Sequence, residues 1–219
     1  MAAGSVVILA FLTAAADGAP AAEKVHLEKD GRVLIEAEDF HSQEKTGRRR
    51  WVLTTAREAQ RVEPDGDPSH AETAGGKAYL EVLPDTRRTH RDKLIRGENF
   101  ADEPGTVAVV HYRVRFQQPG RYFVWVRAYS TGSEDNGIHV GLDGRWPESG
   151  RRLQWCEGKN SWRWESKQRT EVNHCGEPGK IFLDIDQPGL HTVSVSMRED
   201  GFEFDRMLLT RDPNHKPEN

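Results

Sequence analysis

Paired carboxylates near both ends of the chain are the residues with the clearest potential for chemistry. The segment Ile35–Phe40 reads Ile-Glu-Ala-Glu-Asp-Phe and sets Glu36 and Glu38 two residues apart. Near the other end, Gly-Phe-Glu-Phe-Asp does the same with Glu203 and Asp205. Residues two apart in a strand share a face. Such pairs suit two chemistries, namely ligation of a hard cation and acid–base catalysis at a glycosidic bond.

Cation ligation is the chemistry that the strand positions favour, with Glu36, Glu38 and Asp205 as the ligands. Calcium takes about six to eight oxygen ligands from carboxylates, carbonyls and water. If the first and last strands lie side by side, the three carboxylates converge and tie the two ends of the domain together. Glycoside hydrolysis by the same residues remains open, and so do carboxylates that simply face solvent.

The common signatures of catalysis do not occur in the sequence. It contains no Gly-x-Ser-x-Gly elbow, no His-Glu-x-x-His motif and no phosphate-binding glycine loop, and its nine histidines are scattered. Neither cysteine is placed as an obvious nucleophile. We therefore expect a binding protein rather than an enzyme, while an enzyme that uses carboxylates of the long loops stays as the alternative.

Short strands separated by tight turns must position these carboxylates. Apolar and polar residues alternate from residue 107 onward, and Gly and Pro recur between the alternating runs. Strands are expected at 107–116, 122–126, 138–142, 181–185, 192–197 and 202–205, with an earlier one at 78–83. No helical periodicity of useful length occurs. The pattern predicts an all-β fold, an antiparallel β-sandwich with long loops.

Turn residues divide the chain further. Gln-Pro-Gly occurs at 118–120, where we expect a hairpin, and again at 187–189, while Asp143-Gly144 is a dipeptide typical of hairpin turns. The stretches 41–105 and 145–180 are richer in charge, Gly and Pro, and are expected to form mostly long loops. The basic run at 47–51 is interpreted as a solvated loop, and Trp125 as a core residue.

Length and composition limit the number of domains and the kind of partner. The 219 residues carry a formal net charge of -4, so the strong positive field of a nucleic-acid binder is missing. We expect one domain over residues 23–210, followed by a polar tail at 211–219. Residues 1–22 match a secretory signal, and no other segment suits a membrane span. These features predict a secreted or periplasmic protein that binds neither nucleic acid nor membrane.

The two cysteines of the chain, Cys156 and Cys175, lie in the irregular stretch 145–180. In an exported protein an even pair favours a disulfide over two free thiols. We expect this bond to stabilise a segment with few strand signals. Four of the six tryptophans also lie there, which argues against disorder.

Several short motifs follow one another in order along the chain. They are Ile35–Phe40, Pro119-Gly120-Arg121-Tyr122 leading to Val126-Arg127-Ala128, Leu142-Asp143-Gly144, Trp162-Arg163-Trp164, Pro188-Gly189-Leu190-His191 and Gly201–Asp205. This combination resembles the β-sandwich carbohydrate-binding modules of families 6 and 35, including the similar domain at the end of some family 115 glycoside hydrolases. The resemblance covers residues 33 to 210.

The resemblance implies a jelly-roll sandwich with a structural Ca²⁺ bound by the two glutamates of the first motif and the aspartate of the last. It also implies a sugar site on loops at one end of the sandwich. The first tryptophan of the Trp-x-Trp pair, Trp162, would stack on a pyranose, and Asp200 would contact its hydroxyls with Arg198 beside it. Phe100 is the best placed second aromatic wall, and Asn136 lies in a loop that would line the site.

We therefore expect a secreted, non-catalytic protein that binds a polysaccharide or oligosaccharide by aromatic stacking, with a catalytic partner module in related proteins. Arginines of the insertion either point to an anionic sugar or add surface charge: Arg145, Arg151, Arg152, Arg163 and Arg169. Two other classes remain open, an enzyme of polysaccharide degradation and a structural or adhesive domain without a sugar site.

Overall fold

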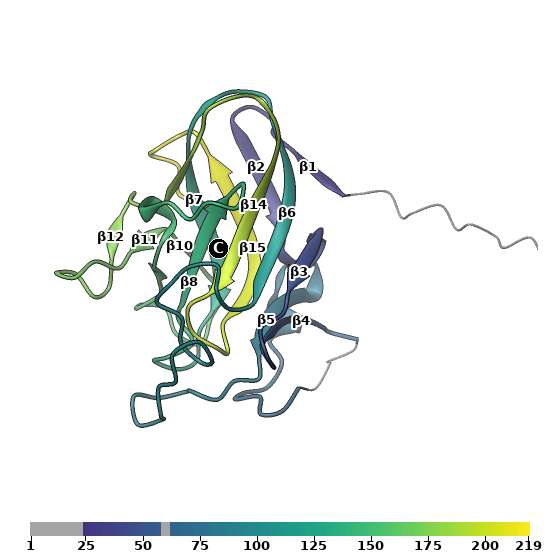
Figure 1. The fold of residues 1–219 in the computed structure, drawn as a ribbon. Helices are drawn as coiled ribbons and strands as arrows, with labels where there is room; N and C mark the ends of the chain where they lie inside the picture. The colour runs from purple at the N-terminus through teal and green to yellow at the C-terminus, as the bar shows by residue number, and fades with distance from the viewer. Residues whose placement is uncertain (1–23, 58–61) are drawn as a thin grey trace, which may run out of the picture.

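The computed structural model describes residues 24–57 and 62–219. These residues form two β-sheets that pack face to face (Figure 1), and the helical segments among them are four short 3-10 helices. The sandwich confirms the predicted fold class. The predicted secretory signal, residues 1–22, lies outside the described residues. No helix in the described part of the chain is long and apolar enough to cross a membrane.

The two sheets contain eight and seven strands. The first sheet consists of β1 (Val25–Leu27), β3 (Ser42–Glu44), β6 (Val109–Phe116), β8 (Gly137–Leu142), β9 (Leu153–Gln154), β11 (Lys167–Gln168), β12 (Glu177–Pro178) and β14 (Gly189–Met197). The second consists of β2 (Arg32–Glu36), β4 (Arg50–Thr55), β5 (Ala78–Leu83), β7 (Gly120–Tyr129), β10 (Arg163–Glu165), β13 (Phe182–Ile185) and β15 (Glu203–Thr210). The 3-10 helices are η1 (Ala37–Asp39), η2 (Ala71–Thr73), η3 (Gly75–Lys77) and η4 (Glu148–Gly150).

Alternate side chains of both sheets fill the space between them. In β7, every second residue from Tyr122 to Ala128 is buried in the core. Trp125, Arg127 and Tyr129 belong to the other face of β7 and are half-buried. The predicted core position of Trp125 is therefore wrong, because the strand register places its ring on the outer face of the second sheet.

Both Gln-Pro-Gly turns carry the chain from one sheet to the other. Residues 118–120 join β6 to β7, and residues 187–189 join β13 to β14. The predicted hairpin at 118–120 is therefore wrong, because its two strands lie in different sheets. Gly120 and Gly189, which end these turns, have φ values of +128° and +147°, a region that favours glycine. Asp143-Gly144 does form the predicted tight turn, between β8 and β9.

Only the first part of the basic run at 47–51 is the expected solvated loop: Gly47 and Arg48 form an exposed turn, whereas the residues after them enter the sandwich. Arg50 begins β4, and Trp51 is 1% exposed in the core, where its Nε1 donates to the carbonyl of Ala108 at 2.8 Å. Arg49 is also buried. This strand could not be recognised in the sequence because arginines precede an apolar part of only a few residues.

A β-bulge interrupts β15 at Asp205. The pairing of β15 with β7 shifts by one residue between Phe204 and Arg206, so Asp205 is an extra residue in the strand. Phe204 and Met207 both pack in the core although they are three residues apart. The bulge thus allows two consecutive charged residues between two core residues.

One end of the sandwich is made of turns, and the other is made of long loops (Figure 1). The antiparallel register brings the end of β5, the end of β7 and the start of β15 together. The segments 84–108, 130–136 and 198–202 therefore leave the sheets at the same end, which we call the loop end. This partly confirms the predicted long loops of residues 41–105, within which β3, β4 and β5 are regular strands.

Candidate functional site

The three carboxylates predicted to bind calcium form a group that we call the clasp: Glu36, Glu38 and Asp205. It lies where β2 and β15 run side by side, as predicted. Arg206 opposes Glu36 in this register, and its Nε donates to Glu36 Oε2 at 2.7 Å. The buried Asp205 accepts the backbone N–H of Gly75 at 2.8 Å and a bond from the Arg127 guanidinium.

Arginines therefore hold two of the three clasp carboxylates. The third, Glu38, follows β2 in η1, and its Oε2 is buried without a hydrogen-bond partner. Burial, and then the carboxylates of Glu36, Asp39 and Asp205, raise the pKa of Glu38. The prediction that these residues approach one another is correct. Bonds from Arg206 and Arg127 join the strands at the clasp, and calcium binding by its three carboxylates stays a prediction.

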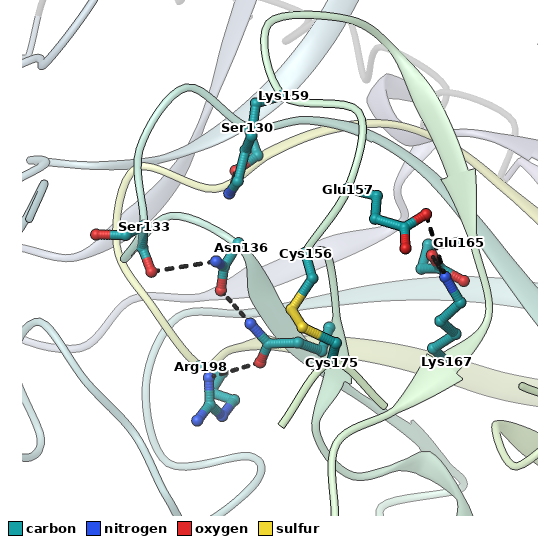
Figure 2. The surroundings of a disulfide bond; sticks show 11 residues. Ser130, Ser133, Asn136, Cys156, Glu157, Lys159, Glu165, Lys167, Cys175 and Arg198 are labelled. Carbon is teal, nitrogen blue, oxygen red and sulfur yellow. Dashed lines mark hydrogen bonds and ion pairs between the residues drawn. A yellow bond between two sulfur atoms is a disulfide. The ribbon is translucent and has the colours of Figure 1, made fainter. Parts of the chain in front are cut away.

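Three of the predicted sugar-binding residues lie together at the loop end but bind within the chain. Asn136 and Arg198 both hydrogen-bond to Gln154, from opposite sides of its amide (Figure 2). The Arg198 guanidinium also lies 4.9 Å from the ring centroid of Phe100. All three predicted residues are buried. Their polar groups join loops to one another instead of facing an open surface.

Asp200, the predicted polar contact to sugar, is fully buried. Its Oδ2 accepts bonds from Arg49 Nη2 at 2.7 Å and from both the backbone N–H and the Oγ1 of Thr86 at 2.8 Å. Burial raises the pKa of Asp200, and these hydrogen bonds act in the opposite direction. The side chain thus ties the loop before β15 to β4 and to the segment after β5.

Trp162 is not an exposed platform. It is 6% exposed, and its ring packs edge-on against Tyr79 and Tyr129, with centroids 5.4 Å away in both cases. Its Nε1 donates to Thr73 Oγ1 at 3.1 Å. The reason is the pairing of β10 with β7, which brings the residue before β10 beside Tyr129 on the outer face of the second sheet.

The predicted disulfide is confirmed. Cys156 and Cys175 are bonded, with their Cα atoms 5.4 Å apart (Figure 2). In the same insertion, Arg151 and Arg152 both pair with Glu148, with closest atoms at 3.6 and 2.5 Å. These two arginines are therefore used within the chain.

An acidic centre that our sequence reasoning missed lies beside Trp162. It consists of Asp65, Asp67, His70, Glu81 and Glu203. These residues form two sets, and the three ligand atoms of each set lie within 4.8 Å of one another. The sets are Asp67, His70 and Glu203, and Asp65, Asp67 and Glu81. Within the described ranges, these two sets are the groups of three or more His, Cys, Asp or Glu residues that could hold a metal ion. The clasp is not such a group.

Strand register and one loop build the acidic centre. Glu81 of β5 and Glu203 of β15 oppose each other, and both point away from the core because their neighbours Leu80 and Phe204 pack in it. Asp65, Asp67 and His70 come from the segment between β4 and η2. The Asp-Gly-Asp spacing of that segment, and glutamates inside two otherwise apolar strands, were signals visible in the sequence.

Negative charge is concentrated in the acidic centre. Glu81 and Glu203 are each 2% exposed, and burial followed by neighbouring carboxylates raises the pKa of both well above the usual range. His70 Nδ1 lies 2.7 Å from Glu203 Oε1, and burial lowers the pKa of His70. The His70 ring stacks on Tyr129, with centroids 3.7 Å apart. Such a group can ligate a cation or share protons.

Open cavities lie at both ends of the sandwich. The loop-end cavity, of about 500 Å³, is lined by Arg88, Thr89, Asp92, Thr131 and Gly132. A second cavity, of about 310 Å³, is lined by Thr46, Gly47, Arg48, Arg49, Gly97 and Glu98. A third, of about 380 Å³, lies at the turn end, and its lining includes Leu142, Asp143, Asp186 and His191.

The chain is similar to a protein of Formosa agariphila described as "Uncharacterized protein P23", with 56% identity over 190 residues. The match covers 87% of this chain and 46% of that protein, so the chain spans about half the length of this curated relative. No family model matches the chain.

Solved structures with a similar fold include carbohydrate-binding modules. The chain aligns with a family 35 carbohydrate-binding module from Clostridium thermocellum at 12% identity and a TM-score of 0.43, covering 81% of this chain and 96% of that one. It aligns with the GH26-CBM35 β-(1,4)-mannanase of Podospora anserina at 14% identity and a TM-score of 0.45, covering 86% and 29%. Both likenesses are remote.

Proposed function

We propose that this chain is a carbohydrate-binding domain whose ligand lies in the loop-end cavity. The observation that carries the proposal is the lining of this open space of about 500 Å³, whose residues Arg88, Thr131 and Asp92 carry a guanidinium, a hydroxyl and a carboxylate. Donors and acceptors that line a cavity of this size match the hydroxyl groups of a sugar.

The lining of the loop-end cavity is held in place by its own hydrogen bonds. Asp92 accepts the backbone N–H groups of Arg88 and Thr89, at 3.1 and 2.7 Å. On the facing segment, Asp135 accepts the backbone N–H groups of Thr131 and Gly132, at 2.7 and 2.9 Å. A wall that is already ordered loses little entropy on binding, which supports recognition of a polar ligand.

The arginines around the loop end favour an anionic saccharide. The Arg88 side chain is 56% exposed in the loop-end cavity, with its Nε 3.9 Å from Asp85 Oδ2, and Arg48 lines the second cavity. A guanidinium pairs bidentately with a carboxylate or a sulfate. The proposed ligand is therefore a uronate-containing or sulfated polysaccharide. The proposal includes bound calcium and a catalytic module in related proteins. It also includes export of the chain, which the disulfide supports.

Affinity electrophoresis on neutral, uronate-containing and sulfated polysaccharides tests this function. We expect an acidic polysaccharide to retard the protein, and Arg88→Ala to weaken the interaction by about tenfold, as expected for loss of a bidentate charged contact. Arg121→Ala is the matched control, because Arg121 is 49% exposed and lies at the start of β7, at the turn end. The absence of retardation on every polysaccharide would contradict the proposal, and so would an equal loss in both variants.

A second candidate, an enzyme of polysaccharide degradation, is favoured by the acidic centre. Glu81 and Glu203 oppose each other on neighbouring strands, and burial raises the pKa of both. A carboxyl group that retains its proton above the usual range can act as a general acid. Release of reducing ends or unsaturated products, abolished by Glu203→Gln, would support this candidate. A polysaccharide that is bound but stays intact would contradict it.

A further inference from the structure

We infer that the acidic centre is a divalent-cation site, separate from the clasp. Its ligands are the carboxylates of Asp65, Asp67, Glu81 and Glu203 together with the imidazole of His70. The sequence prediction placed the cation at the clasp, and the structure points to a different set of residues. The inference does not depend on the proposed saccharide site.

Charge balance distinguishes the two groups of carboxylates. In the clasp, Arg206 and Arg127 pair with Glu36 and Asp205. In the acidic centre, no arginine or lysine of residues 24–57 and 62–219 pairs with any of the four carboxylates, and the basic partner is His70 alone. Buried carboxylates without a counter-charge are costly to keep ionised. A divalent cation supplies the missing positive charge.

Unsatisfied oxygens identify where the ion binds. Glu203 Oε2 is buried and has no hydrogen-bond partner, although Oε1 of the same group contacts His70. Glu81 is as buried as Glu203 and faces it across the two strands. A buried carboxylate oxygen without a donor is unfavourable, and metal ligation satisfies it. Both glutamates belong to the sets of converging ligand atoms.

Within each set, the spacing of the ligand atoms suits one ion. Calcium binds oxygen at about 2.3 to 2.6 Å, so two ligands of one ion lie within about 5 Å of each other. The ligand atoms of each set lie within 4.8 Å, and Asp67 belongs to both sets. The oxygens suit Ca²⁺, whereas the His70 nitrogen suits Mn²⁺ or Zn²⁺. The chemistry common to all three is a divalent cation with mainly oxygen ligands.

Such an ion would fasten a loop to the second sheet. Asp65 and Asp67 belong to the segment after β4, whereas Glu81 and Glu203 belong to β5 and β15. Thr131, which lines the loop-end cavity, donates its hydroxyl to Asp67 Oδ2 at 2.6 Å. Loading of the acidic centre would therefore also order one wall of that cavity.

Native mass spectrometry and thermal unfolding of the chelator-treated full chain test the inference, with Ca²⁺, Mn²⁺ and Zn²⁺ in separate experiments. We expect stoichiometric binding of at least one of these ions and a higher melting temperature in its presence. Glu81→Gln and Asp67→Asn should each weaken binding by about tenfold or more. Glu38→Gln, which removes a clasp carboxylate of the same type, should change the affinity by less than about twofold.

The opposite pattern of losses would overturn the inference, as would the absence of stoichiometric binding with all three ions. If Glu38→Gln abolished binding while Glu81→Gln and Asp67→Asn retained it, the ion would belong to the clasp. Asp67 is half-buried in a loop, so its variant provides the test even if Glu81→Gln does not fold. No saccharide enters these measurements, so their outcome is independent of the electrophoresis result.

Discussion

Asp85→Asn should stabilise the cation-free protein by an amount that grows with pH. Asp85 is 6% exposed, lies close to Gly66 and Gly201, and has an Oδ1 without a hydrogen-bond partner. Burial, and then the carboxylates of Asp200 and Asp135, raise its pKa from 3.8 to about 7. Asparagine has almost the same shape and cannot ionise, so the substitution isolates the effect of the charge.

The sign and size of the effect follow from the two pKa values of Asp85. The unfolded chain ionises near 3.8, whereas the folded chain keeps the proton up to about 7. The stability contributed by this group is therefore complete below pH 3.8 and is lost as the pH rises to about 7. A rise of about three pKa units corresponds to about 4 kcal/mol. The variant avoids this loss.

Urea unfolding of both proteins in a chelating buffer, from about pH 4 to about pH 8, measures the difference. We expect nearly equal unfolding free energies at the acidic limit and a gain approaching about 4 kcal/mol for the variant at the alkaline limit. Asp184→Asn is the control, because Asp184 is exposed and pairs with Arg121. A gain for Asp85→Asn that stayed constant with pH, or a less stable variant at the alkaline limit, would refute the reasoning.

Three further predictions concern stability. Arg127→Met should lower the unfolding free energy by about 3 kcal/mol, because it removes the closer of the two arginines that pair with the buried Asp205 and leaves only Arg206, at 3.9 Å. Arg121→Met at an exposed pair should lower it by less than about 1 kcal/mol, and urea unfolding compares the two variants. Reduction of the Cys156–Cys175 bond should lower the unfolding free energy by about 3 kcal/mol. Urea unfolding with and without reductant measures this difference, and equal unfolding free energies would contradict the prediction. Burial lowers the pKa of His139 to about 3, so stability linked to this group is complete above pH 6.5 and is lost as the pH falls towards 3. Nitrogen NMR shifts should show a neutral His139 imidazole at about pH 5, and a protonated ring there would contradict the prediction.

Two mainly apolar strands could be predicted from the sequence almost to the residue. The strand expected at 78–83 is β5, and the strand expected at 138–142 is β8 with one residue added. A short apolar run bounded by glycine or proline indicates a buried strand directly. β4 could not be recognised because arginines precede its short apolar part. The turn at 118–120 indicated a reversal of the chain, but no local signal says which sheet the next strand joins.

The candidate sites were harder to predict because they depend on contacts between distant segments. Glu36 and Asp205 could be expected to meet, since the first and last strands of a sandwich often pair. Their arginine partners depend on register and on the bulge. The burial of Trp162 depends on the segment that contains His70 and Thr73, which no periodicity in the sequence places over the sheet. The acidic centre likewise draws its residues from three separate segments.

The bulge makes Asp205 the residue that β15 can lose without a change in which side chains face the core. Asp205 has no partner on β7, because Phe204 pairs with Ala128 and Arg206 pairs with Arg127. Deleting Asp205 would leave an even ladder in which Met207 stays opposite Val126 in the core. Deleting a paired residue such as Met207 would instead shift every later residue by one position and turn Leu209 outward. Whether β15 keeps its inner face after a deletion is therefore expected to depend on whether the lost residue had a partner on β7.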